Sequence, residues 1–273
     1  MAKLFGFFDY SKEGPGIRKD APKKKAFFVF FGTFFRNFWK FITINVVYSL
    51  ISLPVITRGM SNAGITNITR NIARDKHSFG LSDFFETIRK NIKQAVAVGI
   101  INTIITAIIG FAVYVYYNSY MHPETKGVFS LIGFGISLSM AMIFAIMNFY
   151  IYTLMITFNF NLKALYKNSF KFVFIKFWKN LLCLILITAV YLLYGLIALV
   201  FPDLRVWILE ILIFIITVPS FKFLLIQFFT FDSIKKHIID PYYEEHPDDD
   251  IEKRRNLGID VPGGDEYDDM SWE

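Results

Sequence analysis

The sequence predicts an all-α protein, a polytopic transmembrane helical bundle, and three observations support that prediction. Of its 273 residues, 54% are hydrophobic and 19% are charged. Soluble domains have roughly 45–50% apolar and about 25% charged residues. Four stretches reach the roughly 20 apolar residues that a helix needs to cross a membrane. Lysine and arginine also gather in alternate loops, as they do on the cytoplasmic side of membrane proteins.

The first element is a basic and aromatic segment, residues 1–37, with eight lysines and arginines. Phenylalanines dominate its second half, and Trp39 follows directly. Aromatic rings favour the headgroup level and long basic side chains lie beside them. The stretch 27–39 is therefore predicted to be an interfacial amphipathic helix on the inner membrane surface.

The second element, residues 41–74, is predicted to be a hairpin broken by Pro54 and Gly59. Its first arm, 41–57, is uncharged, and basic residues flank it on both sides, so a single crossing would place one basic flank outside. The return arm, 61–74, covers only about 21 Å of a core of about 30 Å, which favours a re-entrant or interfacial position. The alternative is that 41–57 crosses as a plain span.

Four full spans follow, and the charges of their loops orient them. Loops 119–127 and 202–205 carry one basic residue each, whereas 58–94 carries seven and 159–180 carries five. The two poorly charged loops are therefore expected outside, with both termini in the cytoplasm. The predicted spans are 95–118, 128–158, 181–201 and 206–231, and with the hairpin they make a transmembrane domain over 38–231.

From residue 232 to 273 the composition reverses, with 14 acidic residues against five basic ones and several prolines and glycines. Such a segment buries too little apolar surface to fold alone, so an acidic cytoplasmic tail is predicted. Its run Asp248-Asp249-Asp250 lacks the glycine turn and closing glutamate of a calcium loop.

Motifs that carry catalysis are scarce. The four histidines are scattered outside the spans, and no HExxH pair, phosphate-binding loop or dinucleotide fingerprint occurs. A single cysteine, Cys183, excludes an intramolecular disulfide and a zinc site built from several thiols. We therefore expect no enzyme activity, cofactor or metal site. The pI of about 9.2 reflects basic residues that flank spans, so no nucleic-acid partner is expected either.

Polar residues inside the spans are the remaining candidates. Lys222 lies nine residues before the end of its span, and a charge at membrane depth is a functional hypothesis by default. It either faces a polar cavity or, because Pro219 bends the helix, reaches the inner interface, and both readings stay open. Asn45, Asn102 and Asn148 are predicted to form hydrogen bonds between helices.

Several motifs stand at the ends of the chain and at the hairpin: Leu4-Phe5-Gly6-Phe7-Phe8-Asp9-Tyr10, Gly14-Pro15-Gly16, Leu53-Pro54-Val55-Ile56-Thr57, Asp83-Phe84-Phe85 and Asp240-Pro241-Tyr242-Tyr243. With Arg74 and His77, they resemble the bacterial YesL-like membrane proteins over nearly the whole chain. The resemblance implies a plasma-membrane protein whose gene lies beside those for ATP-driven carbohydrate importers. The family has no known biochemical function, so the resemblance assigns no chemistry to a residue.

The function we expect is a non-enzymatic accessory or regulatory component of a carbohydrate importer. Its contact with importer subunits is expected on the cytoplasmic surface of 70–93 and 163–180, although the lysines of 163–180 also suit anionic lipid of the bilayer. The alternative is a small-solute transporter or channel, because broken helices near a buried charge build many transport sites. The candidate residues are Lys222, Pro54, Gly59, Gly64, Arg74 and His77; the oligomeric state stays open.

Overall fold

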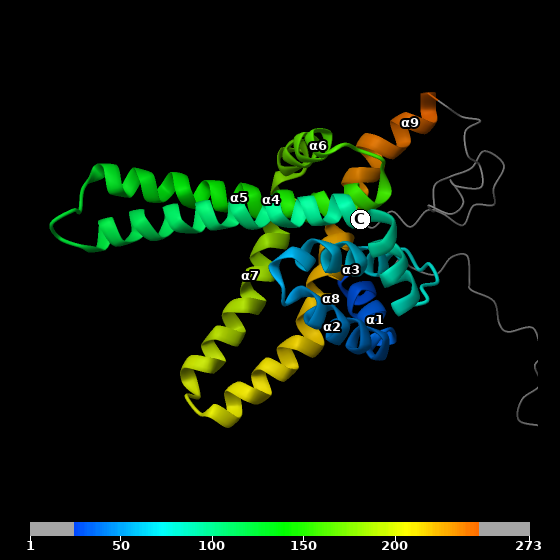
Figure 1. Ribbon diagram of the computed structural model, residues 1–273, viewed down its shortest axis with the longest axis horizontal. Coiled ribbons are helices and arrows are strands. Elements are labelled where there is room, and N and C mark those ends of the chain that lie inside the picture. The colour runs from blue at the N-terminus through cyan, green and yellow to red at the C-terminus, as the bar shows by residue number, and fades with distance from the viewer. Residues whose placement is uncertain (1–24, 246–273) are drawn as a thin grey trace, which may run out of the picture.

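The computed structural model describes residues 25–245, and all regular elements in this part of the chain are helices (Figure 1). Most of the predicted segment 1–37 and the acidic tail beyond residue 245 lie outside the described residues. Within these described residues, four helices are long and apolar enough to cross a membrane, which confirms the predicted helical bundle. The chain is thus a membrane protein.

Two long helical hairpins define the shape. Helix α4 (Leu81–Met121) packs along α5 (Val128–Thr157), and α7 (Phe177–Val200) packs along α8 (Leu204–Ile234). The two hairpins meet at one end and diverge toward their tips (Figure 1). In the most apolar 18-residue stretch of each spanning helix, only 11–33% of the residues are buried within the protein. Most of these side chains are therefore left to face lipid.

The predicted break in the first hairpin is confirmed at Pro54. Helix α2 (Phe38–Ser52) ends just before it, a short 3₁₀ turn (Val55–Thr57) follows, and α3 (Arg58–Ala73) returns beside α2. The Thr57 hydroxyl donates to the Ile51 carbonyl and to the Pro54 carbonyl, 2.9 Å away. The elbow therefore satisfies carbonyl groups that the break removes from the helix ladder.

Helix α3 is buried among α2, α4, α5 and α8 although its sequence is semi-polar. Close approach to α4 makes this possible: a Cβ on Gly59 would lie 2.0 Å from the Ala95 carbonyl oxygen and 2.8 Å from the Cα of Gly99. One turn and a half further on, a Cβ on Gly64 would lie 2.7 Å from the Phe84 ring. The prediction that Gly59 helps to break the hairpin is wrong, because Gly59 lies inside α3; Gly59 and Gly64 instead have packing roles.

Asn45 of α2 is fully buried and inserts its amide into the backbone of α8 beside Pro219. Its Nδ2 donates to the Ile216 carbonyl at 2.5 Å, and its Oδ1 accepts from the Ser220 backbone N–H at 2.9 Å. In a regular helix these two backbone groups would bond to each other. The predicted interhelical role of Asn45 is confirmed, as is that of Asn102, whose Nδ2 donates to Asn148 Oδ1 at 2.7 Å.

The remaining helices lie at the end of the bundle opposite the two tips, which we call the basic end. They are α1 (Ala26–Arg36), α6 (Leu162–Ile175), a π-helical turn (Lys235–Ile239) and α9 (Asp240–Glu245). Helix α4 also starts here, 14 residues before the predicted span 95–118, so 81–94 is helical. Its start is fixed by Gly80, at φ 67°, and by Asp83, whose carboxylate accepts from the Phe79 N–H at 2.9 Å.

Candidate functional site

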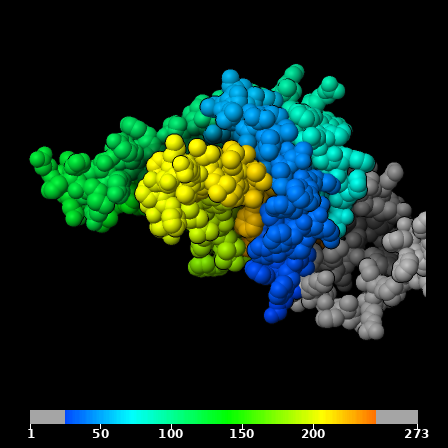
Figure 2. All heavy atoms as spheres, turned by 90° about the horizontal axis from the view of Figure 1, so that it is seen from below, coloured from blue at the N-terminus to red at the C-terminus, as the bar shows by residue number. Residues whose placement is uncertain are grey.

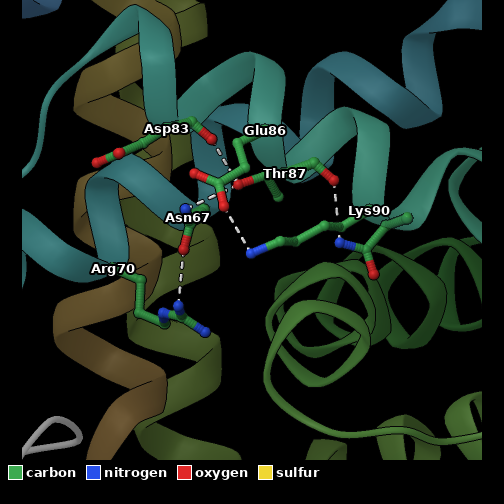
Figure 3. Close-up of polar contacts among 7 residues, drawn as sticks. Asn67, Arg70, Asp83, Glu86, Thr87 and Lys90 are labelled. Carbon is green, nitrogen blue, oxygen red and sulfur yellow. Dashed lines mark hydrogen bonds and ion pairs between the residues drawn. The ribbon is translucent and has the colours of Figure 1, made fainter.

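A polar cavity of about 360 Å³ opens at the basic end, within the size range of small-molecule sites. It lies between the second half of α3, the first turns of α4 and the end of α5 (Figure 3). Its walls are mostly polar. The lining residues are Asn67, Arg70, Asn71, His77, Phe79, Asp83, Glu86, Thr87, Lys90, Asn91 and Ile156.

Arg70 joins the walls of the cavity. Its guanidinium donates to Thr157 Oγ1 at 2.8 Å. It also donates to Asn67 Oδ1 at 2.6 Å, and Asn67 Nδ2 in turn donates to Thr87 Oγ1 at 2.8 Å (Figure 3). The Arg70 Nε is buried without a hydrogen-bond partner in the described chain, and no carboxylate of residues 25–243 forms an ion pair with it. Arg70 therefore brings positive charge to the cavity while bridging α3 and α5.

The α4 wall presents one face of the helix, with functional groups three or four residues apart. Glu86 and Lys90 form an ion pair at 2.6 Å, and the Asn91 amide donates to the Thr87 carbonyl at 3.0 Å. One oxygen of Asp83 accepts from the Ser78 hydroxyl at 2.9 Å. The acidic groups are thus partly engaged and held in fixed positions.

Charges on the cavity wall offset one another. The two positive charges of Arg70 and Lys90 balance the two negative charges of Asp83 and Glu86. A cationic ligand is therefore repelled by the first pair and an anionic ligand by the second. Amide and hydroxyl groups supply both donors and acceptors, which is what a hydroxyl group requires. At the rim, the Phe79 ring is 75% exposed, and it packs edge-on to the His77 ring at 4.6 Å.

Arg74 lies beside the cavity rather than in its wall. Its guanidinium lies 3.9 Å from the centre of the Phe231 ring, and its Nε and one terminal nitrogen are buried without hydrogen-bond partners in the described chain. Burial and, secondarily, the charge of Arg70 lower the pKa of Arg74 to about 9. Arg74 therefore still carries its charge at neutral pH, held largely by the aromatic face.

The structure places the other predicted candidates elsewhere. Of these residues only His77 lines the cavity. Pro54 lies at the break of the hairpin, whereas Gly59 and Gly64 lie within α3 and pack against α4. Lys222 lies on α8 with its Nζ 5.2 Å from the centre of the Phe223 ring.

Sequence reasoning missed Asn67, Asp83, Thr87 and Asn91 as members of one site, and it counted Arg70 only as part of a surface. The signal was present in the spacing, since positions 83, 87 and 91 recur every four residues. Counting 58–94 as a basic loop between spans hid that periodicity.

Comparison with known proteins relates one part of the chain to a family and finds no other relative. No curated protein and no solved structure matches the chain. Residues 41–117 match the model of the family described as "Protein of unknown function, DUF624". This range contains the whole of α3 and α4 as far as Tyr117, and so it contains the facing α3 and α4 walls of the cavity.

Proposed function

We propose that the protein is a non-enzymatic accessory or regulatory component that works beside an ATP-driven carbohydrate importer in a bacterial plasma membrane. The choice of a carbohydrate importer as the partner comes from the resemblance to YesL-like proteins, whose genes lie beside importer genes. The observation that carries the proposal is the shared location, at the basic end, of the charge-balanced cavity and the exposed face of α6. By the positive-inside rule this end lies in the cytoplasm, where the importer's ATPase also works.

The cavity supports this proposal through its chemistry. A neutral, hydroxyl-rich solute of the carbohydrate class needs many donors and acceptors and no net charge in its site. The walls offer amides, a hydroxyl and two pairs of opposite charges. An exposed ring at the rim, Phe79, adds an apolar surface against which a flat sugar face can pack.

Helix α6 supplies the surface for a partner. Lys163, Lys167 and Lys171 are exposed at intervals of four residues and so lie on one face, with exposed Phe170 and Phe174 beside them. Among the side chains that the structure describes, residues 25–243, no carboxylate forms an ion pair with these lysines. An acidic partner surface would complement this face.

Reversing two of these charges tests the proposed association. We expect Lys167→Glu with Lys171→Glu to reduce co-purification with the neighbouring carbohydrate importer in mild detergent by at least tenfold, because each reversal replaces attraction by repulsion. The matched control is Lys126→Glu, at the tip between α4 and α5. Co-purification that is absent in the unaltered protein, or equal in the double variant and the control, would refute the association.

A second candidate, a small-solute transporter, is favoured by a chain of polar groups between helices. Tyr166 donates to Asn102 at 2.7 Å, Asn102 donates to Asn148 at 2.7 Å, and Tyr48 donates to Asn62 at 3.0 Å near the hairpin elbow. Uptake of sugars by liposomes that contain the purified protein would favour the transporter. A lack of uptake together with importer co-purification would favour the accessory role.

A further inference from the structure

An apolar groove of about 610 Å³ runs along the protein between α1, α7 and α8. Phe30 and Phe31 form one side, Leu186 and Leu193 of α7 the other, and Phe221 and Leu225 of α8 the floor. In Figure 2 the orange part of α8 is visible between the blue atoms of α1 and the yellow atoms near the α7–α8 tip. The walls are almost wholly apolar, so water is a poor occupant.

The groove has one polar end, and that end lies at the basic end of the bundle. Lys179 of α7 and Asp232 at the end of α8 line it, with Lys179 Nζ 3.8 Å from Asp232 Oδ2. From Lys179 to Leu193 the groove follows α7 for about 21 Å, which exceeds the roughly 15 Å depth of one leaflet. An occupant therefore combines a polar head at the interface with a long apolar chain.

The charges at the polar end decide which head is favoured. Just before α7, Lys176 interacts electrostatically with Asp232, Lys179 and Lys236, so three lysines act on this side of the groove against one carboxylate. Burial lowers the pKa of Lys176, and repulsion by Lys179 and Lys236 acts in the same direction, against the attraction of Asp232. This surplus of positive charge is relieved by a phosphate group.

We propose that this groove is a binding site for one anionic phospholipid, with an acyl chain against α7 and α8 and the headgroup phosphate among Lys176, Lys179 and Lys236. The site is separate from the polar cavity and does not depend on the importer association. It differs from the general lipid coat because it joins a built apolar groove to a localised excess of positive charge.

Native mass spectrometry of the full-length protein in detergent tests the site, with phosphatidylglycerol and phosphatidylcholine of identical chains as probes. We expect one phosphatidylglycerol to be retained in preference to phosphatidylcholine by tenfold or more. Lys179→Gln should reduce that preference about fivefold, which is the typical effect of one basic residue near a membrane surface. Lys126→Gln, at a tip, should leave it unchanged.

A second variant separates the groove from the charges. Ala189 is exposed and lines the groove, whereas Ile185 is exposed on the same helix outside its lining. Ala189→Trp should reduce retention of both lipids by filling the groove, and Ile185→Trp should not. Equal retention of the two lipids by the unaltered protein, or equal behaviour of the two tryptophan variants, would overturn the proposal.

Discussion

Replacing Gly59 by alanine is expected to lower the thermal midpoint of the protein by about 10 °C in detergent, which corresponds to about 3 kcal/mol for a chain of this size. The new methyl group would lie 2.0 Å from the Ala95 carbonyl oxygen and 2.8 Å from the Gly99 Cα. Backbone atoms cannot rotate away as a side-chain tip can, so α3 and α4 must separate. Overpacking of this kind lies at the upper end of the usual 1–3 kcal/mol range.

Gly110 provides a matched control in the same pair of helices. It lies on α4, and a Cβ there would have no heavy atom within 4 Å. Gly110→Ala should leave the midpoint unchanged or raise it slightly, because alanine is the better helix former. Equal midpoints for the two variants would contradict the close crossing of α3 and α4.

Replacing Asn45 by alanine is expected to have a similar effect, a loss of about 3 kcal/mol and roughly 10 °C in the thermal midpoint. The change removes the partners of the Ile216 carbonyl and the Ser220 N–H, and each unsatisfied buried group costs about 1–3 kcal/mol. Pro219 supplies no N–H of its own, so α8 cannot fully repair its ladder at this point.

Asn118→Ala is the control for that variant. In the part of the chain that the structure describes, the Asn118 side chain bonds within its own helix, to the Tyr114 carbonyl at 3.0 Å near the tip of α4. Its loss should change the midpoint by no more than 1–2 °C. A similarly small shift for Asn45→Ala would show that its amide does not support the α8 backbone at Ile216 and Ser220.

Much of the fold was predictable because membrane crossing imposes length and composition on a sequence. The four spans, the break at Pro54 and the interhelical amides of Asn45 and Asn102 all follow from local residue types. The burial of α3 does not, since its mean hydropathy is low. It depends on Gly59 meeting Gly99, which lie 40 residues apart, and a single sequence contains no signal that pairs them.

The cavity was harder to predict than the fold for a related reason. His77 was singled out, but Asp83 and Thr87 belong to the site only because α4 begins at Leu81. That start depends on the positive φ of Gly80 and on the Asp83 carboxylate that caps the Phe79 N–H. Arg70 enters because Thr157, 87 residues away, anchors it beside α5.

Calorimetric titration of the purified full-length protein with neutral monosaccharides tests the central claim most directly. Saturable binding is predicted for a neutral sugar, and it should be at least tenfold tighter than binding of the corresponding sugar phosphate. Asn71→Leu, which removes a polar group from the cavity wall, should weaken binding at least tenfold, while Asn118→Leu should not change it. Binding that is absent across a broad panel of neutral sugars, or that survives Asn71→Leu unaltered, would contradict a solute site in this cavity.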